Sequence, residues 1–368
     1  MNIHLLKWGV LVSLLFALCF SACNNDGSDN GQSTFAEMSK QKARGENGEI
    51  ILVISPDLWD SEVGEQIRSL FNQPVKGLPQ DEPKYSVKKT DPSKFNSVLK
   101  ASKNLLFVAA LSDKTQEGLY MKKYFTDNSL KQIADNPKLF SFNQEDVYAT
   151  GQEVLYLFGR TDAELAANLA RHKNQVSEFF NAKEQERLLA DLKKSVSSGI
   201  MKYVSDTLGV DLVVPFGYDI ARKEDNFIWF RKLDQREELN FWLVKMPYDD
   251  EGVFDVDKFK SFRNELGRKY ITDIDNDSLY LTTQDELPLL IDTVNLNGNY
   301  ALEARGLWKY SNNSRGGAFV SYLFANEQDG LLYYLEGYLD NPGKDKREPI
   351  RLIETILGTA DVPDALKD

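Results

Sequence analysis

Five side chains in the last quarter of the sequence have the chemical character of a binding patch for an anion or a sugar. They are Arg305, Trp308, Arg315, Lys346 and Arg347. Guanidinium groups form paired hydrogen bonds with carboxylate and phosphate, and the flat face of an indole suits a sugar ring. We therefore take these five residues as the candidate binding patch.

Arg305 and Trp308 also have an ordinary structural interpretation. They lie three positions apart in one predicted strand, so they point to opposite faces of a sheet and only one of them can enter the core. If Trp308 is the core residue, Arg305 is expected to pair with a nearby carboxylate, which is the usual fate of an arginine in an acidic protein. The sequence leaves both interpretations open.

Groups for metal binding or nucleophilic catalysis are scarce. Apart from a histidine in the N-terminal leader, the chain has only His172, so we expect no zinc cluster and no serine-histidine-aspartate triad of conventional spacing. His172 falls on the apolar stripe of a predicted helix, which indicates a core or interface residue. Asp273, Asp275 and Asp277 have the spacing of a calcium loop, but the glycine and the glutamate that complete such a loop are missing. We predict a solvated turn there, no metal and no cofactor, and we assign no catalytic residue.

The N-terminus has the pattern of a bacterial lipoprotein signal. Residues 8–20 are almost wholly apolar and follow one lysine, and small residues precede Cys23, whereas Leu18 precedes Cys19. We predict a signal peptide over residues 1–22, acylation of Cys23, and a disordered tether over residues 23–48 that is rich in Gly, Asn, Asp and Ser. Lipid would then anchor the protein to the cell envelope, at the outer membrane, with the side that it faces left open.

The charge of the chain limits its partners. Because the leader carries one basic residue, Lys7, and no acidic one, its removal changes the net charge from −12 to −13. An excess of negative charge argues against nucleic acid and anionic lipid surfaces as ligands. The predicted partners are the membrane, through the N-terminal lipid, and an envelope protein or glycan.

The elements that must position the candidate patch alternate between strand and helix patterns. Predicted strands cover residues 49–54, 84–89, 104–111, 146–148, 153–159, 211–220, 227–231, 239–246, 279–283, 289–294, 300–308, 318–324 and 331–339. Predicted helices cover residues 57–71, 115–133, 161–208 and 255–270, with a short one near 91–92 and a last one that ends at 357.

We predict an α+β fold of two packed halves, residues 49–198 and 199–360. Their sheets are expected to be largely antiparallel, with helices on one face. The last three strands form an antiparallel meander, which the final helix covers.

Several segments resemble a family of predicted Bacteroidota lipoproteins that is known only as a domain of unknown function. The similar segments are ILVISPDLW, GLPQDEP, FGYDI, FIWFR, RGLW, GGAFV and KDKR, in this order over nearly all of residues 49–358. Next to Gly316 and Gly317 the family tends to have Met before and Pro after, where this chain has Arg315 and Ala318, so the turn there is expected to differ. The resemblance supports the lipoprotein address and implies no activity.

The sequence leaves two hypotheses for the function. The first is a non-catalytic binding or assembly module, which fits the missing nucleophiles and cofactor loops together with the Arg and Trp cluster. The alternative is a hydrolase of a glycan or cell-wall polymer that works through two carboxylates. The chain has 56 acidic residues, so some close pair is inevitable and the sequence singles out none.

The anchor can be tested through Cys23. We expect Cys23→Ser to move the protein from the membrane fraction to the soluble fraction, because the variant has no thiol to acylate at this position. Fractionation of cells followed by intact-mass measurement checks this, with Cys19→Ser as the matched control that should stay anchored. A Cys23→Ser protein that remained in the membrane fraction would exclude the lipoprotein interpretation.

Overall fold

The computed structural model describes residues 40–235 and 237–363. The expected signal peptide, Cys23 and most of the expected tether lie outside these ranges. Residues 41–48, which we expected to be disordered, pair instead with the folded unit. Ala43 donates a backbone hydrogen bond to Thr150 (2.8 Å) and Arg44 donates one to Ala101 (2.7 Å). The folded unit therefore begins at Gln41.

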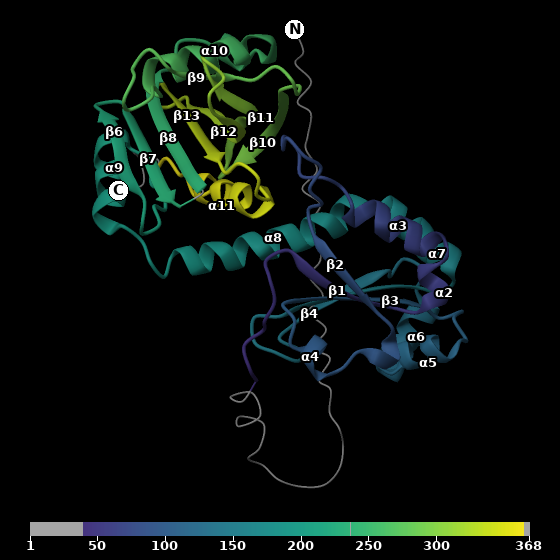
Figure 1. The fold of residues 1–368 in the computed structure, drawn as a ribbon. Coiled ribbons are helices and arrows are strands. Elements are labelled where there is room, and N and C mark those ends of the chain that lie inside the picture. Colours follow the sequence, from purple (N-terminus) through teal and green to yellow (C-terminus); the bar gives the residue numbers. More distant parts are fainter. Residues whose placement is uncertain (1–39, 236, 364–368) are drawn as a thin grey trace. The chain divides into compact units, whose positions relative to one another are not determined.

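The first half of the chain contains a five-stranded sheet in the order β2, β1, β3, β5, β4 (Figure 1). The strands are β1 (Glu49–Ile54), β2 (Ser86–Thr90), β3 (Asn104–Ala110), β4 (Ser141–Glu145) and β5 (Glu153–Gly159). The first four in this order run parallel, and only β4 is antiparallel to its neighbour. This corrects our expectation of a largely antiparallel sheet in this half. Helices make the long crossovers that parallel strands require.

Helices cover both faces of this first sheet, whereas we expected them on one. The elements are α2 (Pro56–Trp59), α3 (Glu62–Phe71), η1 (Pro92–Lys94), α4 (Ser97–Lys100), α5 (Gln116–Lys122), α6 (Asp127–Asp135), α7 (Asp162–Arg171) and α8 (Lys173–Leu192). Alternate residues of β1 and β3 enter two different apolar clusters, one with α3, α7 and α8 and the other with α5 and α6. A strand such as β3, buried along its whole length, needs cover on both sides.

The second half contains the larger sheet, and all of its strand pairs are antiparallel, as we expected for this half. Its order is β10, β11, β12, β13, β8, β7, β6, with β9 paired to β11. The strands are β6 (Asp219–Glu224), β7 (Phe227–Asp234), β8 (Glu237–Pro247), β9 (Leu281–Thr283), β10 (Leu290–Leu296), β11 (Asn299–Tyr310), β12 (Gly316–Asn326) and β13 (Leu331–Asp340). The predicted meander is therefore β11 to β13.

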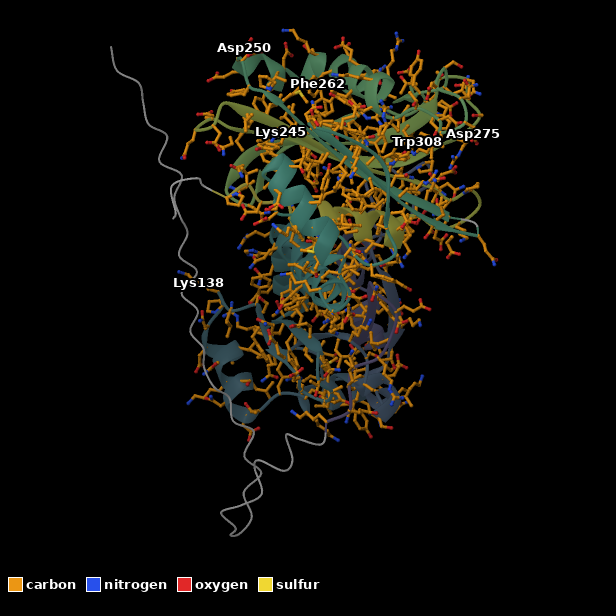
Figure 2. All side chains as sticks on the ribbon, turned by 90° about the vertical axis from the view of Figure 1, so that its left-hand side faces the viewer. Lys138, Lys245, Asp250, Phe262, Asp275 and Trp308 are labelled. Atoms are coloured by element: carbon orange, nitrogen blue, oxygen red, sulfur yellow. The ribbon has the colours of Figure 1, made fainter. Side chains whose placement is uncertain are left out.

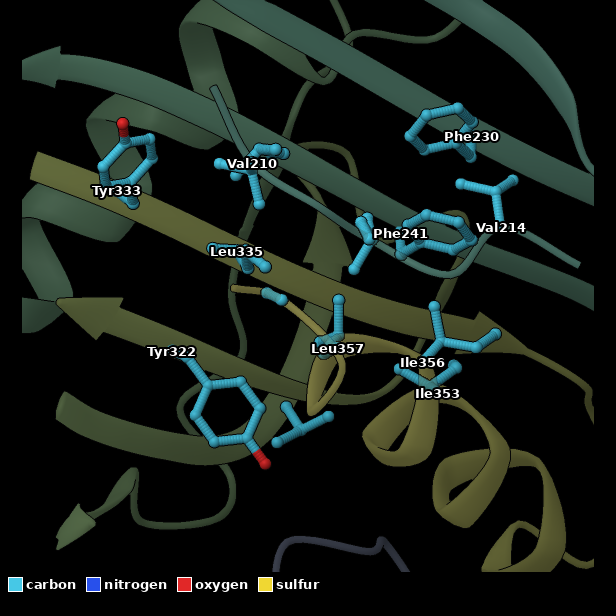
Figure 3. Close-up of a cluster of buried hydrophobic side chains, with 14 of the residues drawn as sticks. Val210, Val214, Phe230, Phe241, Tyr322, Tyr333, Leu335, Ile353, Ile356 and Leu357 are labelled. Atoms are coloured by element: carbon cyan, nitrogen blue, oxygen red, sulfur yellow. The ribbon is translucent and has the colours of Figure 1, made fainter. Parts of the chain in front are cut away.

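This sheet, too, is covered on both faces, and again we expected one. In Figure 1, α10 (Val256–Tyr270) lies along one side of the sheet and α11 (Arg347–Leu357) along the other, the side that α9 (Ser198–Leu208) also covers. The short η2 (Glu251–Phe254) precedes α10. Figure 3 shows the cluster on the α11 side, where Ile353, Ile356 and Leu357 meet Leu335 of β13.

The predicted strand 146–148 is not a strand, and the predicted helix 115–133 is two helices, α5 and α6. Two further predicted elements differ from the structure for one reason. The predicted helix 161–208 is three helices, which break at His172 and at residues 193–197, and the predicted strand 211–220 contributes only its end to β6. Residues 195–197 pair instead with 214–216: Ser197 donates to the Val214 carbonyl (2.9 Å) and Phe216 donates to that of Ser195 (3.0 Å). Tertiary pairing thus outweighs local helix and strand propensity here.

A buried ion pair fixes α10 to the larger sheet. Arg263 of α10 binds Glu336 of β13 through two hydrogen bonds of 2.7 and 2.8 Å, and both side chains are fully buried. Tyr334 donates to the same carboxylate, and Thr283 accepts from the guanidinium. Such a pair is sustained because its remaining hydrogen-bonding groups are also satisfied. The α+β class that the sequence predicted is confirmed, with two sheets and helices packed on each.

No helix among the described residues is long and apolar enough to cross a membrane.

Gly337 offers a direct test of the packing between α11 and the sheet. A Cβ at this position would lie 2.0 Å from Cγ2 of Ile353 on α11. We expect Gly337→Ala to lower the free energy of unfolding by about 1 to 3 kcal/mol, because the helix must move or the side chain must leave its rotamer. Urea denaturation measures this difference.

Gly199 provides the matched control. It lies in α9 with open space around its Cα, so Gly199→Ala should be neutral or stabilise by about 1 kcal/mol at most. In the double variant Gly337→Ala with Ile353→Ala, the two losses should not add, since the clash is gone. A Gly337→Ala protein as stable as wild type would contradict the close contact.

Candidate functional site

A cavity of about 350 Å³ brings together two residues of the candidate patch, Arg305 and Arg347. Its floor is the sheet face of β10 to β12, and its walls are α11, α8 and the loop of residues 72–85, which we call the strap. Five basic and three acidic side chains line it, in a chain that is acidic as a whole. The basic lining side chains are Lys76, Lys84, Arg305, Arg347 and Arg351.

Arg305 lies at the centre of the floor and is held by two carboxylates. The odd-numbered residues at this point of β11 face α11, so Glu303 and Arg305 lie on the same side. Arg305 Nε donates to Glu303 Oε1 (2.6 Å), and Nη1 donates to Glu354 of α11. Burial works to lower the pKa of Arg305, but Glu354 and Glu303 outweigh it and hold the pKa above the usual range of arginine. The guanidinium therefore stays charged.

Tyr322 of β12 completes this network. Its hydroxyl donates to Glu303 Oε2 at 3.0 Å, and burial followed by the charges of Glu303 and Glu354 raises its pKa well above the ordinary value. Figure 3 shows its ring beside the core cluster with the hydroxyl pointing away from that cluster. At neutral pH the tyrosine is therefore a hydrogen-bond donor to the carboxylate rather than an acid or base of the cavity.

The strap reaches the second half through an apolar anchor and a close turn. Its two arms pair with each other, since Val75 donates to the Glu82 carbonyl (2.9 Å). Leu78 at its tip is buried in the core cluster of the larger sheet. Gly77 has a φ of +78°, and a Cβ there would lie 2.8 Å from Cβ of Arg305. Only glycine combines this backbone conformation with this contact.

Glu82 of the strap caps α11. Its carboxylate accepts hydrogen bonds from the backbone N–H groups of Lys346 (2.8 and 2.9 Å) and Arg347 (2.8 Å). The first N–H groups of a helix have no partner within the helix and carry partial positive charge, so a carboxylate there satisfies both needs. A residue far away in the sequence thus takes the role that a local serine or aspartate usually has.

Two arginines of α11 donate hydrogen bonds to backbone carbonyls of the strap. Arg347 Nη1 donates to the Pro83 carbonyl (3.1 Å) and Arg351 Nη2 donates to that of Lys84 (2.9 Å), while both also pair with Glu348. Lys84 Nζ lies 3.8 Å from Glu178 of α8, which is too far for a direct hydrogen bond. Lys84 therefore carries the least engaged charge at this end of the cavity.

The cavity continues along α8. It adjoins a second cavity of about 500 Å³, with which it shares Gln185, Val294 and Glu354, and that one adjoins a third of about 530 Å³ through Leu189 and Asn297. We call the three together the α8 groove. It runs from Glu178 to Lys193, a distance of roughly 22 Å at 1.5 Å per residue.

The other three residues of the candidate patch lie elsewhere. Trp308, Arg315 and Lys346 line a separate cavity of about 680 Å³. Trp308, which is labelled in Figure 2, is a core residue that is 1 % exposed, and its Nε1 donates to the Leu339 carbonyl at 3.0 Å. Arg315 binds Glu238 and Asp340, and Lys346 Nζ donates to the Lys344 carbonyl. The structure thus divides the five residues into two groups, of which the first adjoins the long groove.

Sequence reasoning missed most partners of Arg305 and Arg347. Glu303 could have been found, because it precedes Arg305 by two positions on a predicted strand and must share its face. Glu82 could not, since no local pattern links it to a helix that begins 265 residues later.

The remaining candidates take structural positions. His172 lies at the break between α7 and α8, where its ring stacks on Phe140 with centroids 4.3 Å apart. In the acidic turn, Asp273 accepts from the backbone of Asp275, which is exposed. Among the described residues, no group of three or more His, Cys, Asp or Glu side chains is arranged to hold a metal ion.

A second candidate for a ligand site lies in the first sheet, at the carboxyl ends of the adjacent strands β1 and β3. Ligands often bind at such a point, because the next strands, β2 and β5, are added on opposite sides of this pair. The chain fills that place with its own groups. Ser55, after β1, donates to Asp113 after β3 at 2.6 Å, and the other oxygen of Asp113 accepts from Thr115. Ser55 and Asp113 are both buried, which favours the α8 groove as the site.

Two family models match the chain, and each covers one half. A domain of unknown function, DUF8532, matches residues 43–193, and a second, DUF4837, matches residues 197–359. The gap between these ranges lies next to the boundary that we expected at residue 198. Neither model carries an activity. A search of the curated proteins finds no match.

Solved structures are only distantly similar. The E65A mutant of Mog1 shares 11 % identity over 43 % of this chain and 92 % of its own, with a TM-score of 0.29. The Ran-binding protein Mog1p of Saccharomyces cerevisiae has 10 % identity, 42 % and 91 % coverage, and a TM-score of 0.29. The lipid transfer and protein localization domain of human StarD13 has 12 % identity, 43 % and 95 % coverage, and a TM-score of 0.21. Likeness at these TM-scores indicates neither a shared fold nor a shared role.

The cap on α11 can be tested through Glu82. We expect Glu82→Ala to lower the free energy of unfolding by about 0.5 to 2 kcal/mol, as the loss of a helix N-cap does. Hydrogen exchange of the first turn of α11 should also become faster, because its N–H groups lose their acceptor.

Asp81→Ala is the matched control, since Asp81 is the neighbouring exposed acid of the strap. It removes the same charge and should leave both the unfolding free energy and the exchange at α11 unchanged. If Glu82→Ala and Asp81→Ala behaved alike, the cap would have no role in holding α11.

Proposed function

We propose that this protein is a lipid-anchored, non-catalytic binding module of the cell envelope, which uses the α8 groove to hold an envelope protein or glycan. The observation that carries the proposal is the groove itself, a row of three adjoining cavities along one helix with a basic end in an acidic chain. The sequence around Cys23 supports the anchor, and the strap and α11 form walls of the groove that are joined by hydrogen bonds.

The charged groups of the groove are arranged for binding rather than for hydrolysis. A glycosidase needs one carboxylic acid that is protonated in the resting enzyme and a second carboxylate across the scissile bond. Glu303 and Glu354 are the two carboxylates of the floor, and Arg305 contacts both. Each carboxylate thus directs an oxygen at the guanidinium, and Glu303 also accepts a hydrogen bond from Tyr322, so neither carboxylate is left open to a scissile bond on both oxygens. The same contacts suit a surface that presents fixed donors and acceptors to a ligand.

A binding module needs a surface that keeps its shape without its ligand. In the groove the polar floor is held by Arg305, Glu303, Glu354 and Tyr322, which satisfy one another. Side chains that are locked by mutual hydrogen bonds lose little conformational entropy when a ligand arrives.

Photo-crosslinking in intact cells of the native host tests this function. We expect p-benzoylphenylalanine at position 185, inside the groove, to form adducts of discrete mass with an envelope component, because Gln185 lines two of the three cavities. Lys138, an exposed residue of the first half (Figure 2), is the control position and should give none of these adducts. Identical adducts at both positions, or none at position 185, would contradict binding in the groove.

A further inference from the structure

The wall of the α8 groove opposite α8 includes the free edge of a β-sheet. β10 ends the strand order of the larger sheet, so one of its edges has no partner strand in that order. Three consecutive residues of β10, Val294 to Leu296, line the second cavity, together with Asn297 of the turn that follows. Since successive side chains of a strand point to opposite faces, a cavity that touches consecutive residues lies against the strand edge. Unpaired N–H and C=O groups on such an edge can add another strand.

The length of the groove matches an extended chain. Its extent of roughly 22 Å along α8 would hold about six to seven extended residues at about 3.3 Å per residue, of which those beside Val294 to Leu296 can pair with β10. Binding modules that add a peptide to a sheet edge obtain affinity from main-chain hydrogen bonds and specificity from the side chains at the ends.

Charge distinguishes one end of the groove from the rest. Lys76, Lys84 and Arg347 lie at the strap end with side-chain exposures of 60, 30 and 20 %, so their charged groups reach the solvent in the cavity. Lys76 pairs with Asp292 at the start of β10, whereas Lys84 makes no direct hydrogen bond to Glu178. A carboxylate placed between Lys84 and Arg347 would gain two cationic partners.

The aromatic content of the groove argues against a sugar chain. An aromatic side chain that binds a sugar needs a solvent-exposed ring face, because the flat face of the indole or phenol packs against the sugar ring. Tyr322 is the aromatic residue of the floor, and it is only 7 % exposed, with its ring in the core cluster. Trp308 is buried in the opposite cluster. Backbone and charge, rather than ring faces, are what the groove presents.

We infer that the α8 groove takes an extended polypeptide segment, which adds as a strand to the free edge of β10 and places an acidic side chain or C-terminal carboxylate against Lys84 and Arg347. This inference rests on the proposed binding function and names its ligand class. The segment belongs to a partner protein of the envelope, recognised by an extended conformation and by negative charge at one end.

Fluorescence anisotropy with defined peptides tests the inference on the full-length chain in detergent. The probe is a labelled octapeptide of alternating threonine and valine that ends in two glutamates, and the comparison peptide ends in two lysines. We expect the acidic peptide to bind at least about tenfold more tightly, because only it complements Lys84 and Arg347.

Two pairs of variants place the peptide. Ala182 is exposed on α8 and lines the groove, so Ala182→Trp should fill the groove and weaken binding about tenfold or more, whereas Ala190→Trp, at an exposed position of the same helix outside the three cavities, should not. Lys84→Glu should remove the preference for the acidic peptide, whereas Lys138→Glu should keep it. Thermal unfolding of each variant shows that it is folded.

The outcomes separate the ligand class from the function. Equal binding of both peptides, or acidic binding that Ala182→Trp leaves unchanged, would overturn the inference. If neither peptide bound but soluble glycan fragments of the cell wall did, and Ala182→Trp abolished that binding, the inference would be wrong and the proposed function would stand. If neither the peptides nor the glycan fragments bound, and position 185 gave no adducts in cells, both the inference and the proposed function would fail.

Discussion

The packing of α11 against the larger sheet is the interaction on which the candidate site depends. One side of this helix places Ile353 directly over Gly337 and closes the core. Its other side carries Arg347 and Glu354 into the cavity. Because one short helix both seals the core and forms a wall of the groove, the position of the charged groups is fixed by apolar packing, which is stiff, rather than by surface ion pairs, which contribute little.

The strap belongs to residues 43–193, which one family model matches, and it contacts α11, which belongs to residues 197–359, matched by the other. Leu78 enters the core of the second half and Glu82 caps α11, so the groove is built from residues of both matched ranges. Neither range alone contains the whole site. The candidate site therefore depends on residues that lie far apart in the sequence, and the range matched by one model does not contain it.

Local patterns in the sequence predicted the elements well and their partners poorly. The strands of the meander and the helix that ends at Leu357 were predicted within a few residues, because alternation and turn residues are local signals. The sequence analysis did not predict helices on both faces of the larger sheet. The signal was present, because β13 is apolar at both odd and even positions, which indicates burial on two sides. The pairing of Ser197 with Val214 and the cap from Glu82 depend on tertiary contacts that no local pattern encodes. Of the five residues that were chosen by type as one patch, Arg305 and Arg347 line one cavity and the other three line another.

Hydrogen exchange of the full-length chain, with and without the acidic octapeptide, is the sharpest test of peptide binding in the α8 groove, because it reports where on the chain a bound strand protects the backbone. We expect protection to increase in residues 290–296 of β10 and in α8, with little change around Gly316 and Gly317 of the separate cavity. Protection confined to residues 313–317, with β10 and α8 unchanged, would contradict the α8 groove as the binding site.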